Sequence, residues 1–332
     1  MNYKARIALV SFDSLGDGLI YLMMAENLRI NGYAVTYYGG IANQIKHWMP
    51  NLTIKAYPQP NMLDQELMQY DLVIMSPPTF LRGQMTDEFT KKMREKWVLI
   101  CQKCPSNWYY DHTERLKTGL PSNIFDQIQR LSDCSGSIRF KQFHQESVVE
   151  MTLRYMEEKM HLPLVTKSVE LMPPLQLQHR RFRERIIISP DSAGPEDKNW
   201  SAKSFLRLCH QLKAKGYDPK IVVAPQHHQA WKEMKGNIYE TPIFHDINGL
   251  TSYIYESGGL IANDSGNGHL ASFLNVPVVT IYRKRNKNFH WRPSWGAGKV
   301  VCPLITPRWY GGKIWKPFIY TPSIIKSLEE IL

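Results

Sequence analysis

The chain has 332 residues, of which 43% are hydrophobic and 11% aromatic, and this length and composition predict two domains with separate cores. Lysine and arginine number 41 against 30 aspartate and glutamate, an excess that favours anionic partners: nucleotide phosphates, anionic lipid head groups or nucleic acid. No apolar run could span a bilayer, no signal-peptide pattern opens the chain, and no zinc-finger, bZIP or RNP-like motif supports nucleic-acid binding. We therefore expect a cytoplasmic protein that does not bind nucleic acid.

The first half of the chain alternates short apolar runs with helical patterns. Such alternation predicts a parallel sheet that is covered by helices on both faces. The predicted strands are residues 7–12, 34–38, 71–75 and 97–101, and the predicted helices are residues 18–30, 41–48, 65–69, 86–96, 124–131 and 146–160.

A double proline at 173–174 and a basic run at 179–185 then predict an interdomain linker with a solvated charged face. The alternation restarts after it. Two doubly wound domains joined by a linker would bind a ligand in the cleft between them, at the carboxyl ends of their strands. Strands are predicted at residues 186–189, 220–224, 259–262 and 278–281, and helices at residues 201–215, 250–257, 270–274 and 323–332.

Three loops at predicted strand ends carry candidate site residues. In the first, Asp17 stands at a helix start, where it is either an N-cap carboxylate or a general base whose pKa partial burial raises. In the second, Lys198 precedes a helix and is either an ordinary exposed lysine or a point charge for a phosphate. The third loop, at 263–268, is a polar glycine-rich turn between a strand and a helix. Such a turn aims backbone N–H groups and a helix dipole at an anion, although Asp264 or Ser265 could equally serve as a simple N-cap.

The five cysteines are an odd number in a chain without a secretion pattern, so we expect reduced thiols. Cys101 and Cys104 have CxxC spacing, but no second Cys/His pair accompanies them. A zinc site is therefore not expected, and a redox role of the pair stays open.

Three motifs in this order resemble glycosyltransferase family 9, the heptosyltransferases of lipopolysaccharide assembly. The third motif fits the family pattern Asp-Thr/Ser-Gly-x-x-His-Leu-Ala in full, and the resemblance covers residues 186–300 more strongly than residues 1–170. The motifs are Ser14-Leu15-Gly16-Asp17, Lys198-Asn199-Trp200-Ser201 and Asp264-Ser265-Gly266-Asn267-Gly268-His269-Leu270-Ala271.

The resemblance implies an α/β protein with the GT-B fold, which is two Rossmann-like doubly wound domains that face each other across a cleft. Residues 1–172 would bind the acceptor, residues 173–322 would bind the nucleotide-sugar, and residues 323–332 would form a helix that crosses back to the N-terminal domain. Asp17 would be the catalytic base of an inverting transfer that uses no metal and no cofactor. The implied donor-binding residues are Ser192, Lys198, Gln226, Asp264, Ser265, Gly266, Asn267, Gly268 and His269.

Two departures from the family concern the donor. The family commonly has an acidic residue that reads the nucleoside after the strand predicted at 220–224, where this chain has Pro225-Gln226-His227-His228. A Gly-Pro-Thr-type loop is replaced by a basic one, in which Arg283, Lys284 and Arg285 either bind an anion or are simply solvated. These changes question ADP-heptose as the donor more than they question the fold.

We therefore expect a glycosyltransferase that moves heptose from ADP-heptose to a lipopolysaccharide core or a related bacterial surface glycan, with a phosphorylated acceptor as one option. The alternatives are a UDP-sugar donor on another glycan, a sugar-nucleotide epimerase and a non-catalytic nucleotide-binding module. Peripheral contact with the inner membrane is left open, through the basic helix that carries Lys91, Lys92, Arg94 and Lys96. The acceptor, the linkage position and the oligomeric state do not follow from the sequence.

Overall fold

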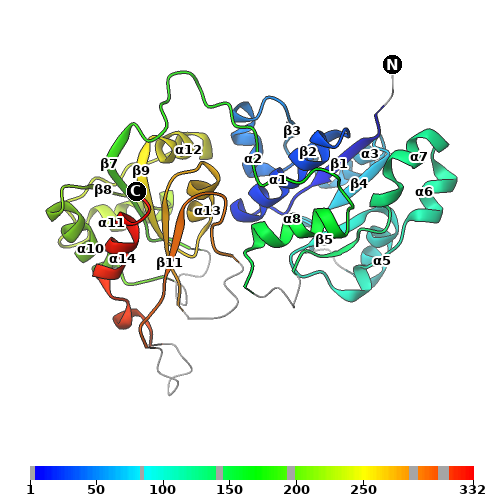
Figure 1. Cartoon of the computed structure of the whole chain (residues 1–332). Coiled ribbons are helices and arrows are strands. Elements are labelled where there is room, and N and C mark those ends of the chain that lie inside the picture. Colours follow the sequence, from blue (N-terminus) through cyan, green and yellow to red (C-terminus); the bar gives the residue numbers. More distant parts are fainter. Residues whose placement is uncertain (1–3, 83–85, 140–144, 193–198, 284–290, 306–313) are drawn as a thin grey trace. The chain divides into compact units, whose positions relative to one another are not determined.

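The computed structural model describes residues 4–82, 86–139, 145–192, 199–283, 291–305 and 314–332. The chain divides into two compact units, residues 1–173 and residues 174–332 (Figure 1). Each unit is built on one parallel sheet, so the predicted α/β class is confirmed.

The first unit has six parallel strands in the order β3-β2-β1-β4-β5-β6, which is the Rossmann order 3-2-1-4-5-6. The direction of strand progression reverses between β1 and β4, and ligands of such sheets bind at the carboxyl ends of these strands. The strands are β1 Arg6–Val10, β2 Ala34–Tyr38, β3 Thr53–Lys55, β4 Leu72–Met75, β5 Val98–Cys101 and β6 Gly136–Ser137. The helices are α1 Leu15–Ile30, α2 Gly40–Gln44, α3 Leu63–Leu67, α4 Thr79–Arg82, α5 Asp87–Lys96, α6 Thr113–Gly119, α7 Ser122–Ile128 and α8 Val148–Glu158.

The second unit has five parallel strands in the order β11-β10-β9-β7-β8, so its progression reverses between β7 and β9. The strands are β7 Phe182–Ser189, β8 Asp218–Ile221, β9 Ser257–Asn263, β10 Val278–Ile281 and β11 Gly298–Val301. The helices are α10 Ala202–Ala214, α11 His228–Lys232, α12 Ile247–Tyr255, α13 Gly266–Phe273 and α14 Thr321–Glu329.

Helix α1 begins and ends as its sequence dictates. The Ser14 side chain caps its N-terminus by accepting a hydrogen bond from the backbone N–H of Asp17 at 3.2 Å. After its last turn, Gly32 adopts a φ of +93°, a left-handed conformation that glycine tolerates better than other residues. Nearly the whole middle of the helix is buried, so the capped start is fixed on a rigid element.

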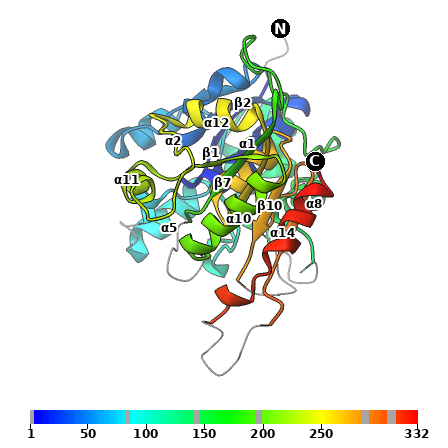
Figure 2. The same ribbon diagram turned by 90° about the vertical axis from the view of Figure 1, so that its left-hand side faces the viewer.

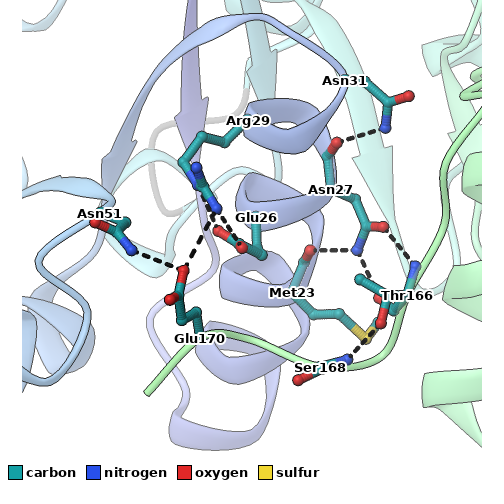
Figure 3. A network of polar contacts seen from close by, with 9 residues as sticks. All are labelled: Met23, Glu26, Asn27, Arg29, Asn31, Asn51, Thr166, Ser168 and Glu170. Atoms are coloured by element: carbon teal, nitrogen blue, oxygen red, sulfur yellow. Dashed lines mark hydrogen bonds and ion pairs between the residues drawn. The ribbon is translucent and has the colours of Figure 1, made fainter. Parts of the chain in front are cut away.

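An extended segment, the strap of residues 164–170, lies along α1 and is held there by polar side chains of that helix (Figure 3). Asn27 binds both backbone groups of Thr166 at 2.7 Å, and Asn31 binds both backbone groups of Leu164 at 2.7 and 3.1 Å. Glu170 at the end of this strap accepts a hydrogen bond from Asn51. The two asparagines thus satisfy backbone groups of the strap as a neighbouring strand would.

Both faces of the second sheet are covered. Helices α10 and α14 bury apolar side chains in one cluster with alternate residues of β7 and β10, including Ile186, Ile188 and Val279 (Figure 2). Helix α13 lies against the other face, where its Gly268 approaches Val278 and Thr280 of β10.

The packing of α14 corrects the prediction that residues 323–332 cross back to the N-terminal domain. Ile324, Ile325 and Leu328 are buried in the core of the second unit. Lys215 of the same unit forms an ion pair with Glu329 at 2.7 Å. Because its apolar face is used within the second unit, this helix belongs there.

Two further predictions need correction in the second unit. The strand predicted at 220–224 is β8, Asp218–Ile221, which contains Pro219 and lies at the edge of the sheet, where proline is tolerated. The basic run at 179–185, predicted as linker, already belongs in part to β7, which begins at Phe182 with an exposed and charged first half.

Candidate active site

Asp17 lies in the first turn of α1, next to the point where the first sheet reverses its progression. Ser14 joins it from the preceding loop, because its hydroxyl also donates a short hydrogen bond to the Asp17 carboxylate. Partial burial raises the pKa of Asp17 above its ordinary value of 3.8, against the opposing effects of the Ser14 hydrogen bond and of Arg82. A carboxylate with a raised pKa at a strand end is suited to accept a proton.

Further residues fix the loop between β1 and α1. Thr79 donates from its backbone N–H and its hydroxyl to Asp13, which ties this loop to the one after β4. Tyr37 donates to Ser11 Oγ at 2.7 Å or to the carbonyl of Gly18 at 3.1 Å. These supports were missed from the sequence, because Thr79 and Tyr37 stand in no motif.

The CxxC pair lies at the carboxyl end of β5. Cys101 and Cys104 are free thiols and both are buried, in keeping with the expected reduced state. A hydrogen bond from Cys104 lowers the pKa of Cys101. Among the described residues, no group of three or more His, Cys, Asp or Glu side chains could hold a metal ion.

The glycine-rich turn of the second unit follows β9, next to the point where that sheet reverses its progression. Helix α13 begins at Gly266, four residues before the predicted start at 270, so Gly266, Asn267 and Gly268 form its first turn. Ser265 holds the N-cap position, but its side chain makes no capping hydrogen bond. The first backbone N–H groups of this helix are therefore not capped by Ser265 and can bind an anion.

Two asparagines brace this turn against β7 and the next loop. The buried amide of Asn263 donates to the carbonyl of Pro190, and its oxygen accepts from the backbone N–H of Trp200 at 3.0 Å. Asn267 donates to Ser189 Oγ at 3.0 Å. Asn267, which was predicted to bind the sugar donor, thus holds the turn in place. Asn263 is a further support, which was not predicted from the sequence.

Two other residues of this motif, which were predicted to bind the donor, contact aromatic side chains of the same unit. The ring of His269 is 3% exposed and meets Trp291 and Trp295 edge to face at 5.5 and 6.1 Å between centroids. Burial raises the pKa of the Tyr282 hydroxyl, and its interaction with the Asp264 carboxylate raises it further. Both residues contribute to the position of the turn.

The loops after β7 and β8 lie together through Asp191, a residue not predicted. Its carboxylate accepts from the backbone N–H of Ala224 at 2.8 Å and lies 3.0 Å from Nδ1 of His227. The predicted Gln226 is exposed in the same turn. Ser192, also predicted, donates to Asn199 at 2.5 Å. Asp191 thus supplies, from the loop after β7, a carboxylate beside the loop after β8, where the sequence shows no acidic residue.

Three predicted residues, Lys198, Lys284 and Arg285, lie outside the described residues. Arg283 of the same basic loop is described and half-buried.

Several charges of the basic helix α5 have partners on the surface of the first unit. Lys96 forms an ion pair with Asp64 at 2.8 Å, Lys92 lies 3.9 Å from the same carboxylate, and Arg94 donates to the carbonyl of Asn107. In the described part of the chain, no helix has both the length and the apolar character needed to cross a bilayer.

Several solved structures that are similar to this one are bacterial glycosyltransferases. ADP-heptose LPS heptosyltransferase II of E. coli is 14% identical, with a TM-score of 0.64 over 98% of both chains. E. coli heptosyltransferase WaaC with ADP is 15% identical, with a TM-score of 0.61 over 98% of this chain and 100% of its own. The iron-containing dodecameric glycosyltransferase TibC of enterotoxigenic E. coli is 12% identical, with a TM-score of 0.54 over 99% and 80%. No curated protein matches the sequence.

The two doubly wound sheets and these likenesses define the GT-B fold of glycosyltransferases. The sequence model of glycosyltransferase family 9 (heptosyltransferase) matches residues 136–307, which is more than half of the chain. The protein belongs to glycosyltransferase family 9, and the predicted family and enzyme class are confirmed.

Proposed function

We propose that the protein is an inverting, metal-independent heptosyltransferase that transfers heptose from ADP-heptose to a lipopolysaccharide core or a related bacterial surface glycan. The first unit would bind the acceptor and the second the donor. The enzyme would act in the cytoplasm, with peripheral contact at the inner membrane. ADP or ADP-heptose is named with several of the similar solved structures, which supports this choice of donor.

The observation that carries the proposal is the start of α13, which the Ser265 side chain does not cap. Backbone N–H groups and the helix dipole at this point favour a diphosphate over a neutral ligand. As the bond to the sugar breaks, negative charge grows on the leaving diphosphate, and fixed donors that already point at it lower the barrier. Lys198 and the basic residues Arg283, Lys284 and Arg285 would add positive charge, while Ser192 and Gln226 would contact the nucleoside side.

On the acceptor side, Asp17 would take the proton from the attacking hydroxyl. The acceptor oxygen then uses a lone pair to form the new bond to the anomeric carbon, while the nucleoside diphosphate leaves from the opposite face. The configuration at that carbon is therefore inverted. Ser14 holds the carboxylate by its hydrogen bond and thereby fixes the direction from which Asp17 can accept the proton. General base catalysis of this kind contributes about 10²–10⁴-fold to the rate.

The first experiment is a thermal-shift panel of ADP, UDP, GDP and CDP with EDTA present. A ligand at about a hundred times its dissociation constant adds about 2.7 kcal/mol of stability, which is readily detected. Selective stabilisation by ADP is the expected result. Selective stabilisation by UDP would indicate a UDP-sugar as the donor in place of ADP-heptose. A shift that requires added metal would contradict metal independence.

A matched pair of variants tests the role of α13. Ser265→Asp places a carboxylate where the diphosphate would bind, so it should abolish the ADP shift while it caps the helix. Thr86→Asp makes the same kind of change at the N-cap of α5 in the first unit, where Thr86 already caps the helix, and should leave the shift intact. Equal ADP shifts in both variants would refute binding at α13.

A further inference from the structure

A cavity of mixed polar and apolar lining in the first unit plays no part in the site described above. It has a volume of about 390 Å³, within the range of about 300–1,000 Å³ typical of small-molecule sites. It lies at the ends of β2 and β3, where Tyr38 and Lys55 close these strands. The residues that characterise its lining are Tyr38, Lys55, Gln59, Met62, Gln65 and Glu66.

The two charged side chains that line this cavity, Lys55 and Glu66, pair with each other. Glu66 accepts from the Tyr38 hydroxyl at 2.6 Å and from Lys55 Nζ at 3.1 Å. These two hydrogen bonds hold the pKa of Glu66 below its ordinary value, so the carboxylate stays ionised beside the lysine. A phosphate in the cavity would have to compete with Glu66 for Lys55, which favours a neutral ligand.

Hydrogen-bonding capacity in the cavity is unused. The side chains of Gln59 and Gln65 are exposed and make no hydrogen bond to the residues that the structure describes. Each amide offers two donors and an acceptor. Met62, which is 45% exposed, and Pro58 add apolar surface beside them. Amides next to a small apolar surface suit a sugar ring, which presents hydroxyls at its rim and C–H groups on its face.

The cavity lies at the same edge of the sheet as the loop that leads to Asp17. Strands β1, β2 and β3 are parallel neighbours, so their carboxyl ends lie at one edge, about 5 Å apart from strand to strand. Tyr57 links the end of β3, beside the cavity, to the loop that leads to Asp17. Its hydroxyl donates to the carbonyl of Ser11 in that loop at 2.9 Å. The cavity therefore lies about two strands, or about 10 Å, from the start of that loop.

We propose that this cavity is a subsite for a neutral sugar residue of the acceptor glycan, next to the residue that receives the transferred sugar. Gln59 and Gln65 hydrogen-bond its hydroxyls, and Met62 packs against its ring. This inference rests on the proposed function, since it assumes that the first unit binds the acceptor. It adds that the enzyme recognises an uncharged unit of that acceptor.

Ligand-observed NMR on the full-length protein tests the subsite directly. The probes are the methyl glycosides of glucose, galactose and N-acetylglucosamine, with glucose 6-phosphate for comparison. We expect saturation transfer to at least one neutral glycoside, its loss in the double variant Gln59→Ala/Gln65→Ala, and its retention in the control Gln129→Ala, which removes an exposed glutamine elsewhere in the unit. Absence of binding by all three glycosides, unchanged binding by the double variant, or preference for glucose 6-phosphate would overturn the subsite.

Transfer kinetics separate this inference from the proposed function. The double variant should raise KM for the acceptor about tenfold, as the loss of two hydrogen bonds predicts, with kcat and KM for the donor unchanged. An unchanged acceptor KM in an enzyme that transfers heptose would refute the subsite alone. Glycoside binding at Gln59 and Gln65 in a protein that ADP does not stabilise would keep the subsite and refute the proposed donor.

Discussion

Asp17 is the residue on which the proposed chemistry depends. Replacing one of its carboxylate oxygens by an NH2 group tests this role. Asp17→Asn keeps the size of the side chain and an oxygen for the Ser14 hydroxyl, but its amide cannot take a proton. We expect kcat to fall by about 10²–10⁴-fold with little change in the donor KM. The measurement is steady-state transfer, with circular dichroism as a check of folding. Turnover near that of the wild type in a folded variant would exclude Asp17 as the base.

The raised pKa of Asp17 also makes a prediction about stability. A carboxyl whose folded pKa lies above its unfolded value of 3.8 stabilises the fold below that value, and the contribution is lost as pH rises through the folded pKa. Asp17→Asn should therefore have a higher Tm than the wild type at pH 7. The difference should shrink as pH falls through the folded pKa and vanish only well below pH 3.8, where the carboxyl is protonated in both the folded and the unfolded state. A lower Tm at pH 7 would show that ionised Asp17 stabilises the fold.

Among the elements, the pairing of β7 with β9 depends on one glycine. A Cβ at Gly258 would lie 1.8 Å from the carbonyl oxygen of Arg183, a backbone atom that cannot move independently of the sheet. We expect Gly258→Ala to destabilise the protein by about 3 kcal/mol in urea unfolding, at the upper end of overpacking effects. Gly119→Ala is the control, because nothing lies within 4 Å of its added carbon. Equal midpoints for the two variants would contradict this packing.

Helix α14 offers a second test at this scale. Leu328 is fully buried in the core of the second unit, and its side chain reaches Gly259 of β9. Leu328→Ala should cost about 2–5 kcal/mol, as large-to-small core substitutions do. Hydrogen exchange should show the loss of protection in β9 and β10, whereas loss confined to the first unit would restore the original prediction of a crossing helix.

The sequence predicted the central strands far better than those at the edges. Six of the seven central strands that the structure describes, β1, β2, β4, β5, β9 and β10, were predicted within two residues of their ends. The seventh, β7, begins four residues before its predicted start because its first half is exposed and charged. The strands at the edges of the two sheets are β3, β6, β11 and β8, of which three were missed and one was displaced. Edge strands here are short and partly exposed, so their sequences lack the continuous apolar pattern of a buried strand.

The candidate site was predictable where a motif marks it. Asp17 and the glycine-rich turn stand at strand ends in the sequence, and both lie beside the reversal points of their sheets. Supports such as Asp191 and Asn263 could not be predicted, because their partners are 33 and 63 residues away along the chain. Contacts at such separations depend on the strand order, which local sequence patterns do not contain.

For the molecule as a whole, the proposal that the second unit binds the nucleotide predicts which segments ADP should protect from hydrogen exchange. ADP should slow hydrogen exchange in the second unit, at β7, β9 and the start of α13, because a ligand stabilises the state that it binds. Exchange in α1 and in the strap of residues 164–170 should not change. Protection by ADP confined to the first unit would reverse the proposed roles. The Ser265→Asp variant supplies the control, since it should remove the effect.

The place of α14 in the second core also has a consequence for how the protein is made. The last contacts of the first unit come from residues up to Met172, whose backbone N–H donates to the carbonyl of Trp48, so this unit can complete its fold early in translation. The second unit needs Ile324, Ile325 and Leu328 to close its core. At about 5–20 residues per second, it therefore waits about 10–30 seconds on the ribosome with apolar strands exposed. The second unit is thus the part for which a nascent-chain chaperone would matter most.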